Sequence, residues 1–237
     1  MSEWKLKRFW KTERVAAAKD GFTIELDGRG VRTPAKAPLI VPTQSLAEAI
    51  AAEWARQEGE IDPVSMPYTR TANAAIDKVR VQKAEVAELL AEYGDSDLLC
   101  YRAEEPAALV ARQAEVWTPY LDWAAETYGA RLSPVSGLMH APQPPEALAA
   151  LKAQVHAMTH FELAAFHDLV SLSGSLVLGF AATRAFATAE TIWEASRLDD
   201  LWQIAQWGED EEAVVVAELK KAAFLHANAF WNALRST

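Results

Sequence analysis

The pattern of apolar and polar residues changes along the chain from strand-like alternation to a helical period. Residues 22–26, with the sequence FTIEL, alternate with a period of two, which is typical of a half-buried strand. Asp-Gly pairs at 20–21 and 27–28 favour hairpin turns, because glycine accepts positive φ. Further short strands are expected at 8–10, 15–18, 31–33 and 39–41. The first 42 residues therefore predict a small antiparallel sheet of about four or five strands.

A helix is expected directly after this sheet. Ser45 is followed three residues later by Glu48, and this spacing is the capping-box signature of a helix start. The helix should run to Gly59, because prolines at 63 and 67 then disfavour helical backbone in the residues before them. It is the natural cover for the apolar face of the sheet. The stretch 46–69 thus forms the joint between a strand-rich part and a helical part.

The expected joint helix carries polar residues on its apolar face. At 100° per residue, Leu46, Ile50 and Trp54 fall on one stripe, and Glu53 and Gln57 fall near its middle. A carboxylate and an amide in that position must be hydrogen-bonded inside the fold or kept for a contact outside it. We therefore assign Glu53, Trp54 and Gln57 a structural role at the joint, with Glu53 held by backbone N–H groups or an arginine.

From residue 69 onward the period is helical. Helices are expected over 76–94, from 106 with a new start at Thr118-Pro119, over 145–156, from a capping box at Thr159 and Glu162, and over 169–183, 188–206 and 211–234. The predicted class is α+β: a small N-terminal antiparallel sheet with a covering helix, followed by a larger all-α part. We place the two domains at 1–68 and 69–237.

Residues 169–183 form the most apolar segment of the chain. About fifteen residues fall short of the roughly twenty that span a bilayer, so no membrane insertion is expected. Ser171, Ser175, Gly179 and Thr183 recur every four residues, and small side chains at this spacing let another backbone approach closely. The segment is therefore expected to be one buried central helix.

Composition and charge restrict the possible partners. Of the 237 residues, 51% are hydrophobic and 24% are charged, as in an ordinary globular protein. The net charge of −10 argues against a nucleic-acid partner, because phosphate binding depends on Lys and Arg. The single cysteine, Cys100, excludes an intrachain disulfide. The first ten residues, MSEWKLKRFW, lack the apolar core of a signal peptide.

Two sets of residues could support catalysis, and each has a simpler interpretation. His156, His160 and His167 could share a helical face and hold a metal, but no HExxH pattern accompanies them. Asp95 and Asp97 could act as an acid–base pair, although Asp residues at a helix end more often cap or form turns. The sequence contains no phosphate loop, no good metal-ligand spacing and no Ser/His/Asp or Cys/His arrangement, so we expect no enzyme, no metal and no cofactor. A metal- or carboxylate-dependent hydrolase remains the alternative.

An acidic run beside a tryptophan is the strongest candidate for a binding site. Trp207 and Gly208 are followed by the four acids Glu209, Asp210, Glu211 and Glu212. Acids at the start of a helix favour its dipole, and this accounts for Glu211 and Glu212. Four consecutive acids next to an indole also suit a protein-binding surface. Helix capping and contact with a partner protein are both open interpretations.

Motifs in a fixed order give the chain a resemblance to one family. The chain resembles the assembly chaperones that bind the free alpha subunit of the catalytic sector of F-type ATP synthase, through Asp27-Gly28-Arg29, Thr33-Pro34, Glu53-Trp54 with Gln57, Met66-Pro67 with Thr69, Ile76-Asp77, Asp97-Leu98-Leu99-Cys100-Tyr101, Gln113 with Trp117 and Pro119, and Trp207-Gly208. The resemblance spans essentially the whole chain. It implies a helper that shields the beta-binding surface of the alpha subunit until the beta subunit replaces it, without ATP hydrolysis.

The resemblance also implies a functional acidic residue shortly after the Trp-Gly pair. By position this residue is Glu211, with Glu212 as the neighbouring choice, because Val214-Val215 stands where many members have His-Asp. We therefore expect Glu211, Glu212, Glu209 and Trp207 to contact the client. We also expect a monomer and, because no transit peptide is visible, the bacterial cytoplasm.

Overall fold

The computed structural model describes residues 7–236 and divides the chain into two compact units. The N-terminal unit comprises the chain up to Lys83, together with Thr159–Ala165 and the residues from Ala229 on. The helical unit comprises Ala84–Met158 and Phe166–Asn228. The expected α+β class, a small sheet followed by a larger set of helices, is confirmed. The boundary at 68/69, as a boundary between domains, stays a prediction, and the compact units group residues 69–83 with the sheet.

Among the described residues, the sheet of the N-terminal unit has four strands, which are β1 (Glu13–Ala18), β2 (Gly21–Leu26), β3 (Arg29–Gly30) and β4 (Ile40–Val41). β2 is central and pairs antiparallel with the other three, with β1 in the register Glu13↔Leu26. Gly21 has a φ of +143°, and a Cβ there would lie 2.2 Å from the carbonyl oxygen of Val41. Only glycine therefore allows β4 to approach β2 this closely.

Two of the strand predictions, at 8–10 and 31–33, are wrong. Residues 8–10 are not a strand; the adjacent Lys7 makes one isolated bridge with Glu60, and the N–H of Arg8 donates to the carbonyl of Gly59 at 2.7 Å. Residues 31–33 contribute only an isolated bridge between Arg32 and Pro38. The first segment pairs with a turn. In the second, the N–H of Val31 donates to the carbonyl of Ile24 in β2 at 2.8 Å, but Arg32 already pairs with the loop residue Pro38, so neither segment forms a ladder.

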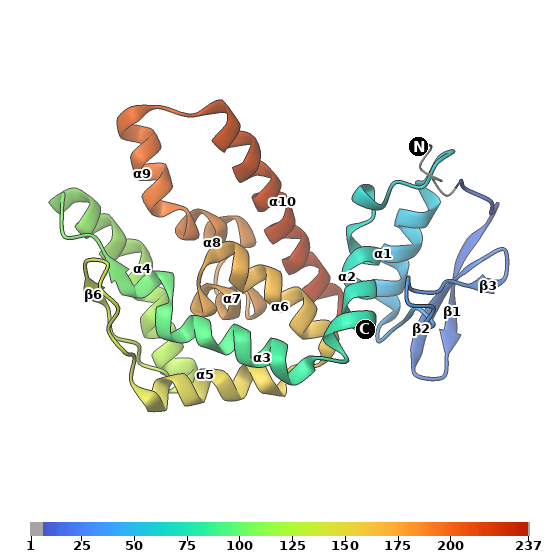
Figure 1. The fold of residues 1–237 in the computed structure, drawn as a ribbon, viewed down its shortest axis with the longest axis horizontal. Coiled ribbons are helices and arrows are strands. Elements are labelled where there is room, and N and C mark those ends of the chain that lie inside the picture. The colour runs from blue at the N-terminus through green and yellow to red at the C-terminus, as the bar shows by residue number, and fades with distance from the viewer. Residues whose placement is uncertain (1–6, 237) are drawn as a thin grey trace. The chain divides into compact units, whose positions relative to one another are not determined.

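The covering helix α1 (Gln44–Ala55) packs on β1 and β2, as Figure 1 also shows. Its N-cap is Thr43, whose hydroxyl accepts from the N–H of Leu46 at 3.3 Å. The expected start at Ser45 and end at Gly59 are therefore wrong. The Thr43 hydroxyl also donates to the carbonyl of Ala233 at 2.7 Å, a long-range contact that selects this residue as the cap.

The helix expected over 76–94 is interrupted. α2 (Pro67–Ala74) continues into a π-helical turn over Ala75–Val79, and α3 (Lys83–Glu92) follows after a turn. The expected C-cap at Gly94 is also wrong, because Gly94 lies buried in a 3₁₀ turn, Tyr93–Ser96. A Cβ on Gly94 would lie 3.2 Å from Leu148 and 3.3 Å from Leu176.

The helical unit contains α4 (Ala107–Tyr128), α5 (Pro145–Ala157), the later part of α6 (His160–Ser173), α7 (Leu176–Thr183), α8 (Ala189–Ser196), α9 (Leu198–Trp207) and most of α10 (Glu211–Ala233). A short parallel pair joins β5 (Tyr101–Arg102) to β6 (Val135–Ser136). The new helix start expected at Thr118-Pro119 is wrong, because α4 continues through Pro119. Pro119 and Glu115 lie on the exposed face, where water can bond the carbonyl that proline leaves without a donor.

α7 is the central helix of this unit, and residues Leu176–Ala182 are all buried. The single helix expected over 169–183 is instead two, because Gly174 takes a φ of +70° and Ser175 caps α7 by accepting from the N–H of Leu178. The predicted close approach does occur: a Cβ on Gly179 would lie 2.7 Å from Val170. Within residues 7–236, no helix is long and apolar enough to cross a bilayer.

Candidate functional site

Helices α9 and α10 carry a group of exposed apolar side chains in the helical unit. Leu198 is the only buried residue of α9, and none of the residues 211–223 of α10 is buried. The exposed large apolar side chains are Leu201, Trp207, Val215, Val216 and Leu219, with Trp207 exposed to 79%. We call the solvent-facing residues 198–223 the α9–α10 surface. Exposed apolar area concentrated in this way indicates a binding surface.

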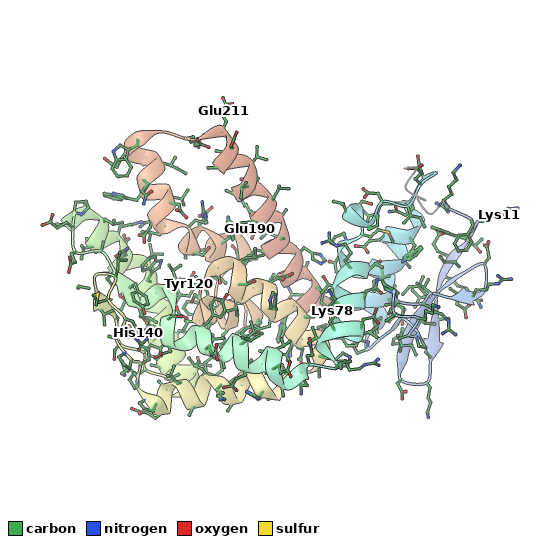
Figure 2. All side chains as sticks on the ribbon, viewed as in Figure 1. Lys11, Lys78, Tyr120, His140, Glu190 and Glu211 are labelled. Carbon is green, nitrogen blue, oxygen red and sulfur yellow. The ribbon has the colours of Figure 1, made fainter. Side chains whose placement is uncertain are left out.

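The acidic turn, residues 207–212, joins the two helices. α9 ends where Gly208 takes a φ of +89° and its N–H donates to the carbonyl of Ile204 at 2.8 Å. Asp210 caps α10, because its Oδ1 accepts from the N–H of Ala213 at 2.8 Å. Figure 2 places Glu211 at the free end of α10. Capping thus accounts for Asp210.

The remaining acids of the turn are free. Within the described part of the chain, Glu209, Glu211 and Glu212 are exposed and make no hydrogen bond or ion pair. Their charges therefore remain available to a partner. The structure brings these three side chains and Trp207 together on one turn, and their assignment to client binding stays a prediction.

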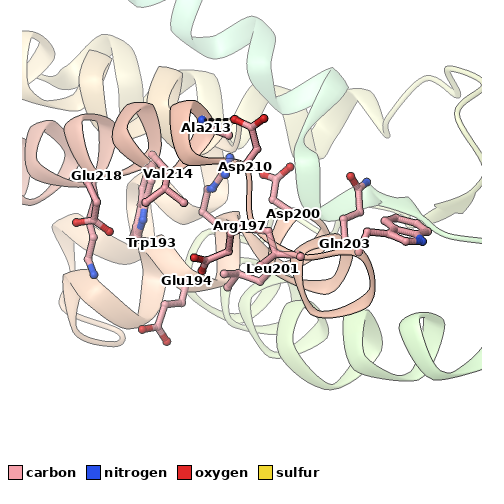
Figure 3. Close-up of a pocket in the computed structure, with 16 residues that line it drawn as sticks. Trp193, Glu194, Arg197, Asp200, Leu201, Gln203, Asp210, Ala213, Val214 and Glu218 are labelled. Carbon is pink, nitrogen blue, oxygen red and sulfur yellow. Dashed lines mark hydrogen bonds and ion pairs between the residues drawn. The ribbon is translucent and has the colours of Figure 1, made fainter.

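A groove of about 520 Å³ lies between α9 and α10, with α8 contributing at its base. Its apolar lining includes Trp193, Leu201, Ile204, Val214 and Ala217. Figure 3 shows labelled residues from all three helices around this space. Of the residues expected from the sequence to bind a client, Trp207 and Glu209 line the groove, whereas Glu211 and Glu212 lie beyond its lining.

The groove is acidic. Five carboxylates line it, Glu194, Asp200, Glu209, Asp210 and Glu218, against the two cations Arg197 and Lys221. One cation is already engaged, because Arg197 forms an ion pair with Asp200 at 2.5 Å and lies over the Trp193 ring at 6.0 Å. Sequence reasoning missed Glu194, Asp200 and Glu218 as lining residues, since a helical stripe does not reveal which face stays uncovered.

The base of the groove is fixed by polar contacts to α4. Gln113 donates to Asp199 at 2.7 Å, and its own amide oxygen accepts from the N–H of Ala103 at 2.8 Å. The indole N–H of Trp117 donates to the carbonyl of Ala195 at 2.8 Å. These bonds hold the start of α9 and the end of α8 on α4. The buried Gln113, unexpected on an apolar face, was the available sequence signal for this role.

Glu53 and Gln57 are buried in the N-terminal unit and are hydrogen-bonded. The Glu53 carboxylate accepts from the N–H groups of Tyr68 at 2.6 Å and Thr69 at 2.8 Å, and from the Thr69 hydroxyl at 2.7 Å. Burial raises the pKa of Glu53, while these donors lower it. Gln57 accepts from the N–H of Asp62 at 2.8 Å. Trp54, expected on the buried stripe, is half-buried and meets Trp10 edge-on, with ring centroids 5.1 Å apart.

Asp97 is fully buried in the helical unit. Its Oδ1 accepts from the N–H of Leu99 at 3.0 Å and the hydroxyl of Ser175 at 2.7 Å, and its Oδ2 accepts from the N–H of Val177 at 3.0 Å. Burial raises the pKa of this carboxyl to about 6, against the lowering effect of those donors. Asp97 thus caps two segments, a 3₁₀ turn and α7.

The residues of the hydrolase alternative have partners elsewhere. His156 pairs with Glu88 at 3.2 Å, and His167 with Asp168 at 3.0 Å. Asp95 accepts from the N–H of Gln143 and contacts His140, both at 2.9 Å. Across residues 7–236, no group of three His, Cys, Asp or Glu side chains could hold a metal. No observed geometry joins these residues into a reacting site.

Comparison with known proteins identifies the family. A family model described as ATP12 chaperone protein matches residues 7–125. The fission yeast (Schizosaccharomyces pombe) protein named Protein atp12, mitochondrial, is 26% identical over 219 residues, covering 87% of this chain and 75% of that protein. The crystal structure of Atp12 from Paracoccus denitrificans matches with a TM-score of 0.96 and 45% identity, covering 98% of this chain and all of that one. A point mutant of the same P. denitrificans protein matches with the same TM-score and identity over 99% of this chain. The resemblance to assembly chaperones of F-type ATP synthase is therefore confirmed, and the chain belongs to the ATP12 chaperone family.

Proposed function

We propose that this chaperone binds the free alpha subunit of the F-type ATP synthase catalytic sector and shields its beta-binding surface until the beta subunit replaces it. The observation that carries the proposal is the α9–α10 surface, an uncovered apolar area with free acids in an assembly chaperone. An unassembled subunit displays apolar surface that is normally buried, and covering it prevents aggregation. Release needs only competition by the true partner for the same surface.

The apolar and acidic parts of the surface have different roles in this proposal. Trp207 and its apolar neighbours supply contact area, since exposed aromatic side chains are frequent anchors of interfaces. Glu209, Glu211 and Glu212 pair with basic groups of the client. Complementary charges raise the association rate and the specificity, and those pairs that are desolvated in the complex also contribute affinity. This division suits a complex that must form quickly and later dissociate.

The proposed activity involves no catalytic step. Four residues of the hydrolase alternative are engaged in separate pairs and caps, which supports a purely binding role: His156, His167, Asp95 and Asp97. We propose a monomer acting in the bacterial cytoplasm, in line with the bacterial source of the matching crystal structures. The fission yeast relative is named as mitochondrial, so the compartment differs within the family.

Charge reversal in the acidic turn tests the proposal. Glu211→Lys and Glu212→Lys should each abolish suppression of alpha-subunit aggregation. Each substitution removes a negative charge from the interface and places a positive charge beside the basic groups of the client, which should weaken binding by ~2–5 kcal/mol. Folding should be nearly unaffected, since an exposed charge near a helix N-terminus contributes about 0.3–1 kcal/mol. Light scattering of the alpha subunit and thermal melting of each variant measure the two effects.

Glu190→Lys is the matched control. Glu190 is also an exposed acid in the first turn of a helix, α8, but it does not line the groove or belong to the acidic turn. Figure 2 labels both residues. The control should lose the same small amount of stability and keep full protection of the client. If all three variants protect the alpha subunit equally, the acidic turn only starts a helix and the proposal fails at this site.

A further inference from the structure

The apolar lining of the α9–α10 groove belongs to helices that have no covering element on this side. Leu201 is 48% exposed, and Ile204, Val214 and Ala217 are half-buried although they face the space between the helices. A groove of about 520 Å³ with such a lining has the size and character of a binding site. An occupant that fills it must therefore present apolar side chains.

The rim of the groove selects the charge of the occupant. Glu194 and Glu218 are exposed at its edges, and Glu209 extends the acidic rim at the turn. None of these three carboxylates has an ion-pair partner within the described residues. Since the Arg197 charge is neutralised by Asp200 at 2.5 Å, the free charge of the rim is predominantly negative. Charge complementarity therefore requires Lys or Arg on both sides of the occupant's apolar stripe.

The walls of the groove decide the backbone conformation of the occupant. α8, α9 and α10 bond their own N–H and C=O groups internally, so the walls offer no strand edge for an extended peptide. A chain entering an apolar groove must satisfy its own backbone groups, because an unpaired buried N–H or C=O is costly. A helix does this without help from the walls. Apolar side chains at i, i+3, i+4 and i+7 then form a single stripe that fits between two helices.

We infer that the α9–α10 groove receives a basic amphipathic helix of the client subunit, its apolar stripe on Leu201, Ile204 and Val214 and its basic residues against Glu194, Glu209 and Glu218. This inference rests on the proposed function, because it assigns the helix to the client. It goes further by naming the structural form and charge of the segment that is bound.

Filling the groove tests the inference with the full-length protein and purified alpha subunit. Ala217→Trp places an indole in the groove, whereas Leu138→Trp places one on an exposed loop of the same unit, outside the α9–α10 surface. Ala217→Trp should weaken binding by about tenfold or more, because the indole occupies the space that the client side chains need. Leu138→Trp should change the Kd by less than about threefold, because it leaves both the groove and the α9–α10 surface unchanged. Calorimetric titration measures both.

Neutralising the rim tests the charge. Glu194→Gln with Glu218→Gln should weaken binding at low salt and flatten its salt dependence, because two carboxylates no longer attract the client. Glu190→Gln, an exposed acid outside the groove, should keep the wild-type salt dependence. An unchanged salt dependence in the double variant would contradict a basic occupant.

Cross-linking identifies the occupant and does not depend on how Ala217→Trp folds. A photo-reactive phenylalanine at position 201, inside the groove, and another at position 219, outside it, are each activated in the complex. Position 201 should cross-link to a segment of the alpha subunit with an apolar stripe of helical period flanked by Lys or Arg. A synthetic peptide of that segment should gain helical circular dichroism on binding.

Failure of the inference is distinguishable from failure of the proposed function. If wild-type protein binds and protects the alpha subunit but position 201 cross-links to nothing, or to an extended or acidic segment, the inference is overturned and the proposed function stands. If wild-type protein does not bind the alpha subunit, both are overturned. Ala217→Trp that folds and binds like wild type would likewise exclude the groove as the site.

Discussion

Two buried carboxylates share a role that local sequence does not reveal. Glu53, 2% exposed, accepts from the first N–H groups of α2, whose own N-cap, Met66, has no side chain able to cap. Asp97, fully buried, accepts from the N–H of Val177 in the first turn of α7. In both cases an acid distant in sequence satisfies donors at a helix N-terminus, where negative charge is also favoured by the helix dipole.

Substitution of Glu53 tests this capping role. Glu53→Ala should lower the free energy of unfolding by roughly 3 kcal/mol, because it leaves the N–H groups of Tyr68 and Thr69 without an acceptor. Glu53→Gln should cost about half as much, since its amide oxygen still accepts and the Thr69 hydroxyl can turn to accept from the NH₂ group. Urea unfolding compares the two, and equal losses would exclude a hydrogen-bonded role.

The raised pKa of Asp97 predicts a pH-dependent stability difference. Its pKa is about 6 in the folded protein and close to the ordinary 3.8 once unfolded, so the folded state binds the proton more tightly. Protonation therefore adds stability that is complete below the unfolded pKa and is lost as pH rises through 6. On going from pH 7.5 to 5, the wild type should gain roughly 1 kcal/mol relative to Asp97→Asn, which cannot titrate.

Comparing the two proteins at each pH cancels the contributions of all other carboxylates, which are common to both. Urea unfolding at pH 7.5 and pH 5 gives the four free energies that are needed. A difference that stays constant, or that shrinks on acidification, would mean that the hydrogen bonds from Leu99, Ser175 and Val177 outweigh burial and keep the Asp97 pKa low.

At the scale of elements, α7 shows what a helix interior requires beyond propensity. Gly179 is a poor helix former, yet its missing side chain allows α6 to pack directly against α7. A Cβ would lie 2.7 Å from Val170 and 3.1 Å from Phe166, both buried. The close approach of α6 and α7 therefore depends on one glycine. The packing that it allows outweighs the low helix propensity of glycine.

Adding a methyl group at this contact tests the argument. Gly179→Ala should destabilise the protein by about 1–3 kcal/mol through overpacking, although alanine is intrinsically the better helix former by about 1 kcal/mol. Thermal melting of the variant measures this cost. In a Val170→Ala background the same change should cost much less, because the clashing Cγ2 is gone. Additive effects in this double-mutant cycle would show that Val170 is not the obstacle.

At the scale of the whole molecule, each compact unit is assembled from segments distant in sequence. The N-terminal unit includes Thr159–Ala165 and the end of α10, where Phe230 is fully buried and stacks with Tyr68 at a centroid distance of 6.1 Å. A boundary read along the chain cannot anticipate such membership. The net charge of −10, by contrast, agrees with the acidic character of the groove.

Much of the fold followed from local patterns. The β1–β2 hairpin and the helices α5 and α10 begin and end within a few residues of their expected positions. The capping box at Thr159 is present, with the Thr159 N–H donating to Glu162 at 2.8 Å. These features depend on neighbours within four residues, which the sequence contains. The acidic turn was found for the same reason, since Trp207 to Glu212 are contiguous.

The features of the fold that only the tertiary structure decided depend on residues far apart in the chain. Three features reflect packing partners that are distant in sequence and cannot be read from neighbouring residues. They are the N-cap at Thr43, the helix break at Gly174 and the continuation of α4 through Pro119. The groove has the same origin: its lining comes from three helices, and which of their apolar faces stays uncovered is settled only when the other faces are buried. By itself the sequence determined the α+β class, the acidic turn and the family resemblance, because each rests on residue types in fixed order. Tertiary packing determined the site's shape, because burial is a property of the folded whole.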